Sequence, residues 1–253
     1  MQLKIKRKIF KIFIDYLPKT QLFDKILSFI QFSIVHKRLP TKKNLLNDKF
    51  YQIKISNEIV DPLRVFITDK EYLKIYLSSV IEKKFIIPTI QIINSESEID
   101  NIVIKESCII KPTHLGGGKF IIKKLGEKLC QAEIYEIKKW FKINLYFASR
   151  ERNHLFLKPK VIVEPLVFND DNITDYKFFC YKGKSKLIAV DTNRKENYSR
   201  GLYDAHWNKI ENISISYKLK IDYNNIIKPK NFELMTKIAE SLSKTFEFIR
   251  IDL

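Results

Sequence analysis

Three of the six glycines in this 253-residue chain are consecutive: Gly116, Gly117 and Gly118. Short apolar runs flank them, Cys108–Ile110 before and Phe120–Ile122 after, which predicts two strands joined by a glycine loop. Glycine lets a backbone approach a ligand and expose successive N–H groups, which suits a phosphate cradle, and Lys111 or Lys119 would add positive charge. The spacing is neither that of a Walker P-loop nor that of a Rossmann turn. The pattern alone leaves open a hairpin turn without a ligand.

The N-terminal half is predicted to contain helices and a few short strands. Residues 1–40 have a helical pattern, and a second helix is predicted after Asp69, a residue type that favours the N-cap position. Short strands are predicted at Phe85–Ile87 and Ile90–Ile93, and a further helix at Glu127–Asn144. Eight prolines and six glycines in the whole chain leave little room for long flexible linkers.

The C-terminal half is richer in strands. We predict a strand at Val161–Val163, a hairpin from Asp175 to Val190 with its turn at Gly183, and an amphipathic helix at Phe232–Lys244. A last strand is predicted at Phe248–Leu253 because apolar and polar residues alternate there.

The last predicted strand carries two charged residues on one face, Arg250 and Asp252. A carboxylate on a strand that faces a phosphate site is a natural Mg²⁺ ligand, since magnesium prefers oxygen donors. A surface salt bridge between the two side chains is the alternative. Taken in isolation, the Arg250-Ile251-Asp252 pattern favours this salt bridge.

The chain is strongly basic, with 46 Lys and Arg against 29 Asp and Glu and a formal net charge of +17. Such a charge is compatible with a nucleic-acid or anionic-membrane partner. The lysines are spread along the chain, however, and Ile and Asn are also abundant, as in proteins from AT-rich genomes. We favour this compositional explanation and expect no nucleic-acid partner. One dense basic group stands out: Lys4, Lys6, Arg7, Lys8 and Lys11.

Cysteine and histidine are too scattered for a predicted structural metal site. The three cysteines (Cys108, Cys130 and Cys180) have no CxxC spacing, and the four histidines form no HxxxH pair. An odd number of scattered cysteines favours a reducing compartment.

The N-terminus is basic and apolar but contains no uninterrupted run of ~18 apolar residues and no signal-peptide cleavage site, so we expect no membrane span. Six apolar residues follow at helical spacing: Leu22, Phe23, Ile26, Leu27, Ile30 and Ile34. Such a stripe is most often directed to the core, and that is the interpretation we favour. Together with the preceding basic residues, the stripe is also compatible with a peripheral contact to an anionic membrane surface.

Taken in order, these and neighbouring segments resemble the TupA-like ATP-grasp family, which is named for a protein of teichuronopeptide biosynthesis. The resemblance runs from about Pro40 to the last residue. It is carried by Thr41–Phe50 with Asn47-Asp48-Lys49, Thr68-Asp69-Lys70, Ile86-Ile87-Pro88, Ile110-Lys111 with the glycine loop, Val161–Glu164, Asp175–Cys180 with Gly183-Lys184, Leu202–Trp207 and Phe248–Leu253.

The resemblance implies an α+β ATP-grasp fold, in which two α+β subdomains surround a nucleotide cleft, preceded by a helical N-terminal segment. The implied divisions are residues 1–40 for that segment, 41–107 for an N-terminal α/β portion, and 108–253 for the nucleotide-binding region. In ATP-grasp relatives another strand follows and brings a glutamate to the metal. Because this sequence ends at Leu253, we expect a truncated member with an incomplete metal site.

The resemblance also implies roles for individual residues. Lys111 would contact the phosphates of ATP beneath the glycine loop, and Glu164 would lie beside the adenine. Asp175 and Lys177 would line the cleft. The sequence His114-Leu115-Gly116 departs from the His-Gly-Ser-Gly that the family leads us to expect, which puts the shape of the loop in question.

Three further residues complete the implied site. Arg194 would reach phosphate or substrate, and Asp252 would be the first Mg²⁺ ligand. Arg194 and Arg250 are both expected to act in catalysis.

The implied function is ATP-dependent carboxylate–amine ligation in the biosynthesis of a bacterial cell-surface polysaccharide. The cofactors would be ATP and Mg²⁺. The partner would be a carboxylate-bearing or sugar-polymer precursor. The protein would be located in the cytoplasm or at the inner face of the membrane. Whether the chain is an active enzyme depends on the metal site. A non-catalytic nucleotide-binding relative and a polysaccharide-locus glycosyltransferase stay open as alternatives, although the sequence lacks the D-x-D-type motif that glycosyltransferases usually show.

Overall fold

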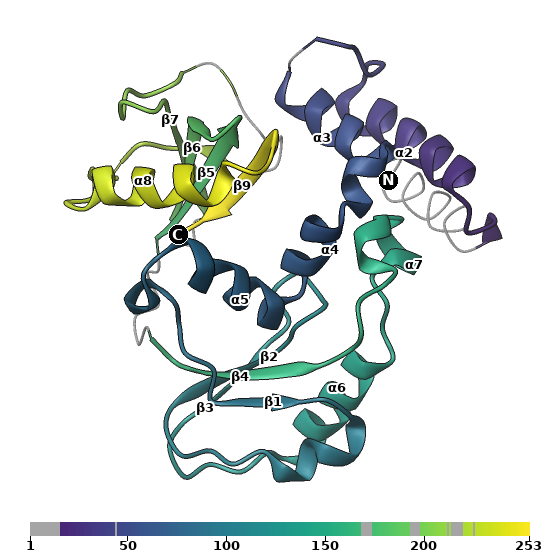
Figure 1. Ribbon diagram of the computed structural model, residues 1–253, viewed down its shortest axis with the longest axis vertical. Coiled ribbons are helices and arrows are strands. Elements are labelled where there is room, and N and C mark those ends of the chain that lie inside the picture. Colours follow the sequence, from purple (N-terminus) through teal and green to yellow (C-terminus); the bar gives the residue numbers. More distant parts are fainter. Residues whose placement is uncertain are drawn as a thin grey trace. The chain divides into compact units, whose positions relative to one another are not determined.

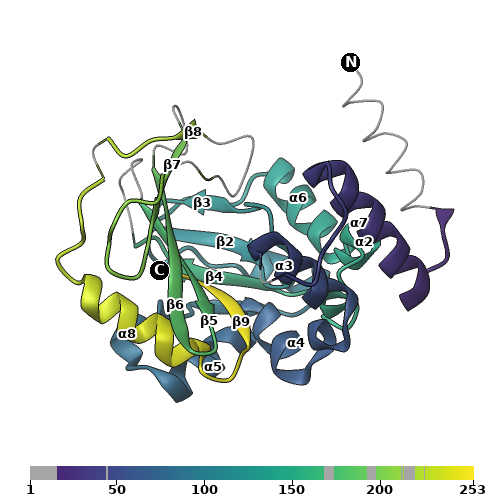
Figure 2. The same cartoon turned by 90° about the horizontal axis from the view of Figure 1, so that it is seen from above.

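The computed structural model describes residues 16–43, 45–167, 174–192, 198–211, 213, 220–224 and 226–253 (Figures 1 and 2). The chain divides into two compact units. The first comprises Met1–Tyr76 and Ile87–Leu166, and the second comprises Leu77–Ile86 and Val167–Leu253. Each unit combines helices with a sheet, which confirms the expected α+β class.

The first unit contains most of the helices. These are α2 (Gln21–His36), α3 (Leu46–Ile55), α4 (Pro62–Thr68), most of α5 (Lys70–Val80), α6 (Gln131–Phe141) and α7 (Tyr146–Ser149), with 3₁₀ helices at Asn57–Val60, Glu96–Asn101 and Arg152–His154. Local sequence explains where they begin. For example, Pro62 occupies the first turn of α4, and Asp61 Oδ1 accepts hydrogen bonds from the N–H groups of Leu63 and Arg64.

The sheet of the first unit has the strand order β1-β4-β2-β3, with every neighbouring pair antiparallel. Its strands are β1 (Gln91–Ile93), β2 (Cys108–Pro112), β3 (Ile121–Lys123) and β4 (Val161–Pro165). Alternate residues of β2 and β4 form the core with α6: Cys108, Ile110, Val161, Val163, Ile137 and Trp140. Lys111 belongs to the other face of the sheet, because successive strand residues point to opposite sides.

Two sequence predictions need correction. Phe85–Ile87 is not a strand, because Phe85 and Ile86 donate their N–H groups to the carbonyls of Glu82 and Lys83 in a 3₁₀ helix at Lys83–Phe85. The helix predicted at Glu127–Asn144 is shorter. It begins at Gln131 because the Glu133 carboxylate accepts the N–H of Cys130 at 2.8 Å, which closes a capping box.

The sheet of the second unit has the order β8-β7-β6-β5-β9. Its strands are β5 (Asp175–Tyr181), β6 (Lys184–Thr192), β7 (Ser199–Tyr203), β8 (Lys220–Ile221) and β9 (Phe248–Asp252). The predicted hairpin is confirmed as β5 and β6. Its two-residue turn has positive φ at Lys182 (48°) and Gly183 (72°), which suits the twist of the strands.

Helix α8 (Phe232–Ser243) packs against one face of this sheet (Figure 1). The core between them contains Phe178, Cys180, Ile188, Val190, Tyr203, Phe232 and Ala239. The helix and the last strand lie where the sequence predicts them.

The apolar stripe of α2 does not have the predicted orientation. Of its six residues, Leu27 is buried and four are exposed, namely Leu22, Ile26, Ile30 and Ile34. The favoured prediction of a core-facing stripe is therefore wrong. Within the described residues no helix is both long and apolar enough to cross a bilayer.

The segment Asn47-Asp48-Lys49 contributes a buried carboxylate. Asp48 accepts hydrogen bonds from the Arg38 guanidinium and from the backbone N–H of Thr41 at 2.5 Å. The Arg38 hydrogen bond is the main reason that the pKa of Asp48 falls to about 2. Asp48 therefore fixes the link between α2 and α3.

Candidate functional site

Glu164 is the centre of a polar cluster on the sheet of the first unit. Its side chain is only 3% exposed, yet it carries two ion pairs. Oε1 lies 2.6 Å from Lys74 Nζ, and Oε2 is paired with Lys111 Nζ. A buried carboxylate is tolerated when cations compensate it, and here two ammonium groups surround one carboxylate.

Strand register places Lys111 next to Glu164. Ile109 lies opposite Glu164 and Lys111 lies opposite Ile162, so the two charged residues are diagonal neighbours on the same face. Lys74 reaches this face from α5. Its Nζ also donates a hydrogen bond to Thr89 Oγ1 at 2.9 Å.

Lys70 lies one helical turn before Lys74, on the same side of α5. Its Nζ donates hydrogen bonds to the carbonyl oxygens of Pro112 (2.8 Å), Thr113 (3.3 Å) and Leu115 (2.5 Å). Burial, followed by the charge of Lys111, lowers the pKa of Lys70 to about 8. Lys70 thus binds the backbone at the point where β2 leads into the glycine loop.

Asp69 fixes the start of α5 against the end of β2. Its Oδ1 accepts the N–H groups of Glu71 (2.9 Å) and Tyr72 (3.3 Å), as predicted for an N-cap. Its Oδ2 accepts the hydroxyl of Thr113 at 2.7 Å. Lys160 Nζ lies 3.7 Å from Asp69 Oδ1 and is also paired with Glu71. Asp69 therefore fixes the position of its neighbour Lys70, because it binds both the first turn of α5 and Thr113 at the end of β2.

The glycine loop begins after three buried residues, Thr113-His114-Leu115, and is itself exposed. Gly117 and Gly118 have φ values of +83° and +72°, in the region that side chains other than glycine rarely adopt. Gly116 has no positive φ, and a Cβ added to it meets nothing within 4 Å. Two of the three glycines are therefore required by backbone conformation.

His114 holds the base of the loop from inside. Its Nε2 lies 3.2 Å from the carbonyl oxygens of both Trp140 and Ile143, and its own carbonyl oxygen lies 3.2 Å from His154 Nδ1. Burial lowers the pKa of both histidines. The buried ring of His114, with His154 bonded to its carbonyl oxygen, thus supports the base of the loop.

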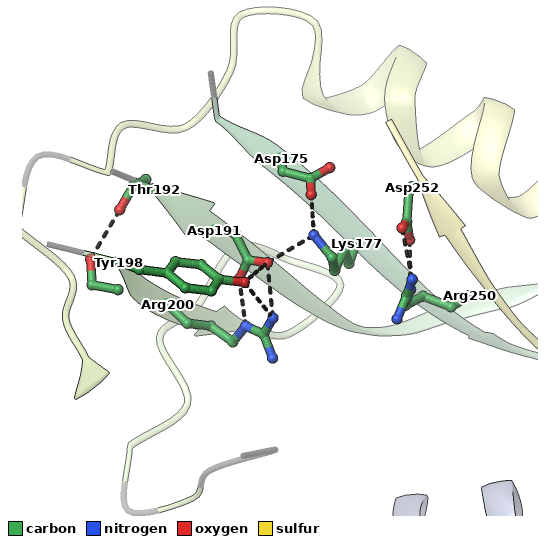
Figure 3. A network of polar contacts seen from close by, with 9 residues as sticks. Asp175, Lys177, Asp191, Thr192, Tyr198, Arg200, Arg250 and Asp252 are labelled. Carbon is green, nitrogen blue, oxygen red and sulfur yellow. Dashed lines mark hydrogen bonds and ion pairs between the residues drawn. The ribbon is translucent and has the colours of Figure 1, made fainter. Parts of the chain in front are cut away.

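The second unit has its own polar cluster, centred on Asp191 (Figure 3). Arg200 binds this buried carboxylate through Nε at 2.5 Å and Nη2 at 2.8 Å, Lys177 Nζ lies at 2.8 Å, and the hydroxyl of Tyr198 donates at 2.7 Å. Burial alone would raise the pKa of Asp191, but the hydrogen bonds from Arg200, Lys177 and Tyr198 outweigh it and lower that pKa. Lys177 is also paired with Asp175.

Register explains why these charges meet. Asp175, Asp191 and Arg200 lie directly opposite one another across β5, β6 and β7, and Lys177 lies opposite Asp252 on β9. All of them therefore belong to one face of the sheet. Alternate residues such as Phe178 form the other face, which packs against α8.

Arg250 and Asp252 also lie on this charged face and bind each other (Figure 3). Arg250 Nε lies 2.6 Å from Asp252 Oδ1, and Nη2 lies 2.8 Å from Oδ2. The two side chains are 44% and 41% exposed, so the pair is a surface ion pair.

A model of the TupA-like ATPgrasp family matches residues 32–253 of the chain. The chain belongs to the TupA-like ATP-grasp family. No curated protein matches it in sequence.

Two solved structures of the ATP-grasp ligase PsnB are similar to the chain. One, complexed with minimal precursor, Mg and ADP, is 11% identical over 74% of this chain and 45% of the other, with a TM-score of 0.36. The other, complexed with minimal precursor, is 10% identical over 83% and 58%, with a TM-score of 0.38. The chain spans about half the length of these structures.

In this ATP-grasp chain, the residues proposed from the sequence form three groups. Lys111 and Glu164 meet in the first unit, and Lys70 donates to the carbonyl oxygen of Leu115 just before the glycine loop. Asp175 and Lys177 meet in the second unit, as do Arg250 and Asp252. Arg194 lies outside the described residues.

Sequence reasoning missed five charged or polar residues of these clusters: Lys70, Lys74, Asp191, Tyr198 and Arg200. A signal existed for two of them, since Lys70 and Lys74 follow the N-cap Asp69 at a spacing of four and must share a helix face. Asp191 directly follows Val190, the last residue of the predicted hairpin, and belongs to β6 in the structure.

Among the described residues, no three His, Cys, Asp or Glu side chains gather to hold a metal ion. Mg²⁺ in nucleotide sites is usually bound by one or two carboxylates together with phosphate oxygens and waters, so a protein-only cage is not required. The exposed carboxylate of Asp252 provides suitable donors, although Arg250 now occupies both of its oxygens.

Proposed function

We propose that the chain binds Mg-ATP and uses it for carboxylate–amine ligation in the biosynthesis of a bacterial cell-surface polysaccharide. Membership of the TupA-like ATP-grasp family supports the nucleotide and the class of reaction. The structural observation that carries the proposal is the concentration of ammonium groups beside the glycine loop: Lys74 and Lys111 pair with the Glu164 carboxylate, and Lys70 donates to the backbone where the loop begins.

The charge balance of this cluster suits a phosphate ligand. Lys74 and Lys111 together carry one positive charge more than Glu164 neutralises. Lysine provides a compact point charge for phosphate oxygens, and backbone N–H groups of a glycine loop can add hydrogen bonds. We assign Lys111 to the phosphates, because its strand leads directly into the loop, and Lys70 to the support of the loop base.

The reaction proposed for this site has two balanced steps. A substrate carboxylate attacks the γ-phosphorus of ATP, and ADP leaves, which gives an acyl phosphate. An amine then attacks the acyl carbon, inorganic phosphate leaves, and the amine loses a proton to give an amide. Holding the reactants together and neutralising the transferred phosphoryl group supply most of the catalysis in such reactions.

Further groups of the proposed function lie on the charged face of the second unit. We assign Lys177 and Arg250, with Arg194, to phosphate or substrate oxygens, and Asp252, with Asp175 nearby, to Mg²⁺. When bound, Mg²⁺ would neutralise charge on the phosphates.

A non-catalytic nucleotide-binding role is the second candidate. It is favoured by the Arg250–Asp252 pair, because both oxygens that a metal ion would use already accept hydrogen bonds. ATP turnover separates the two candidates, since both predict nucleotide binding.

The first test is a thermal shift with Mg-ATP, Mg-GTP, UDP-glucose or Mg²⁺ alone. A ligand at ~100 times its dissociation constant adds ~2.7 kcal/mol to the free energy of unfolding. We expect a shift with ATP that Lys111→Ala abolishes and that the exposed control Lys128→Ala retains. No shift with any nucleotide in the wild type, or an unchanged ATP shift in folded Lys111→Ala, contradicts the proposal. Release of ADP in the presence of a carboxylate and an amine then distinguishes ligase from binding protein.

A further inference from the structure

Helix α2 buries both polar and apolar residues on one side and exposes a group of apolar residues on the other. The residues it buries include Asp24 and Ser28, beside Leu27 and Phe32. Six large apolar residues of the helix are 37% to 64% exposed: Val35 and five others, namely Leu22, Ile26, Phe29, Ile30 and Ile34. We refer to these five as the α2 stripe. Their spacing of three and four residues places them on one side of the helix. Single exposed apolar residues are ordinary, whereas a contiguous group marks an interaction surface.

The orientation of α2 within the first unit is fixed by a buried ion pair. Arg150 Nη1 lies 3.0 Å from Asp24 Oδ1, and Asp24 Oδ2 accepts the hydroxyl of Tyr146 at 2.9 Å. The Arg150 guanidinium also donates to the carbonyl oxygens of Leu17 (2.8 Å) and Pro18 (3.0 Å). Turning the α2 stripe inward would break this pair and leave a buried charge uncompensated, so the stripe is held outward.

The charges around the α2 stripe have one sign. The only acidic residue of the helix is Asp24, and it is buried against Arg150. Lys25 on the helix and Lys19 and Lys37 at its two ends are exposed. A partner for this surface must therefore offer apolar groups to the stripe and negative charge to the lysines that flank it.

We propose that the α2 stripe docks on an anionic membrane surface, with its apolar side chains below the headgroups and the flanking lysines at the lipid phosphates. A helix of this kind binds through buried apolar area together with attraction to anionic lipids. A second copy of the chain fits less well, because two surfaces of the same positive charge repel each other. Tyr16, which is exposed just before the helix, is a residue type found at membrane interfaces.

The test is flotation of the full chain with vesicles of phosphatidylcholine alone or mixed with phosphatidylglycerol. We expect binding to the mixed vesicles that weakens as salt is raised, because salt screens the lysines. Ile26→Gln should weaken binding about fivefold, and Ile26→Gln with Ile30→Gln more than tenfold. Leu234→Gln on α8 is the matched control, since Leu234 is 42% exposed and Ile26 is 41% exposed. Circular dichroism and thermal unfolding should show that all variants stay folded.

Several outcomes overturn the proposal. They are equal binding to neutral and mixed vesicles, no binding to either, and unchanged binding by the folded double variant. Self-association of the wild type that Ile26→Gln abolishes, measured by sedimentation without lipid, would assign the α2 stripe to a second copy instead.

Discussion

Lys111 and Glu164 lie diagonally across the β2–β4 pair, on the same face of the sheet, and form an ion pair. Lys74 shares the same carboxylate from α5. Glu164 therefore has two functions that a substitution can separate: it stabilises two lysines of the folded chain, and it reduces the positive charge that an anionic ligand meets.

Glu164→Gln keeps the size of the side chain and removes its charge. We expect the free energy of unfolding to fall by about 1–3 kcal/mol, because Lys74 and Lys111 lose a buried charged partner. ATP affinity should be retained or increased, since repulsion of phosphate is removed. Urea unfolding and titration calorimetry measure the two effects. Glu82→Gln, in an exposed pair with Lys84, is the control and should change stability by less than about 0.5 kcal/mol. A loss of ATP affinity in folded Glu164→Gln would show that the carboxylate itself contacts the nucleotide.

Two alanine substitutions in the glycine loop should differ. Gly117→Ala places a side chain at a φ of +83° and should cost up to about 1–2 kcal/mol of stability unless the loop rearranges. Gly116→Ala enters open space and should leave the stability of the ligand-free chain unchanged. Thermal unfolding of both variants without nucleotide tests the difference. If the two variants are equally stable and bind ATP like the wild type, neither folding nor ATP binding requires the positive φ of Gly117.

Lys70 should produce a dependence of stability on alkaline pH. Its pKa is about 8 in the folded chain and 10.5 in the reference state, so between these values the unfolded chain binds a proton that the folded chain does not. Stability of the wild type relative to Lys70→Met should therefore rise from pH 8 to 10.5, by about 3 kcal/mol at most. Urea unfolding of both proteins across this range measures the difference. A constant difference, or one that falls with pH, contradicts a lowered pKa.

The buried and exposed carboxylates of the second unit should differ in their effect on stability. Asp191→Asn leaves Lys177 and Arg200 without their shared counter-charge and should cost about 3 kcal/mol. Asp252→Asn breaks an exposed pair and should cost less than about 1 kcal/mol. Because the pKa of Asp191 is lowered by folding, its contribution is present above its reference pKa of 3.8 and is lost as the pH falls. The difference between wild type and Asp191→Asn in urea should therefore shrink below pH 4. Similar costs for both variants at pH 7 would contradict the structural role of Asp191.

Local patterns in the sequence predict much of this fold. Alternation identifies β9, the Lys182-Gly183 turn identifies the β5–β6 hairpin, and Asp69 identifies the start of α5. Each of these features depends on residues close together in the chain, where propensity and capping decide the structure.

The clusters around Glu164 and Asp191 were only partly predictable, because strand order and register bring their members together. Nothing in the spacing of Lys111 and Glu164 shows that β2 pairs with β4, or that Lys74 reaches the same carboxylate. The prediction that the apolar residues from Leu22 to Ile34 face the core was wrong for a related reason. Helical periodicity shows that a stripe exists, but the partner of Asp24 is Arg150, which is 126 residues away.

That separation also affects the order of events during synthesis. At about 5–20 residues per second, a ribosome needs roughly 6–25 s to add the 126 residues between Asp24 and Arg150. For much of this interval the helix segment that contains Asp24 lacks its Arg150 partner, and its apolar residues on both sides are open to the first surface that they meet. A chaperone or a nearby bilayer thus competes with the chain's own Arg150 for the newly made helix.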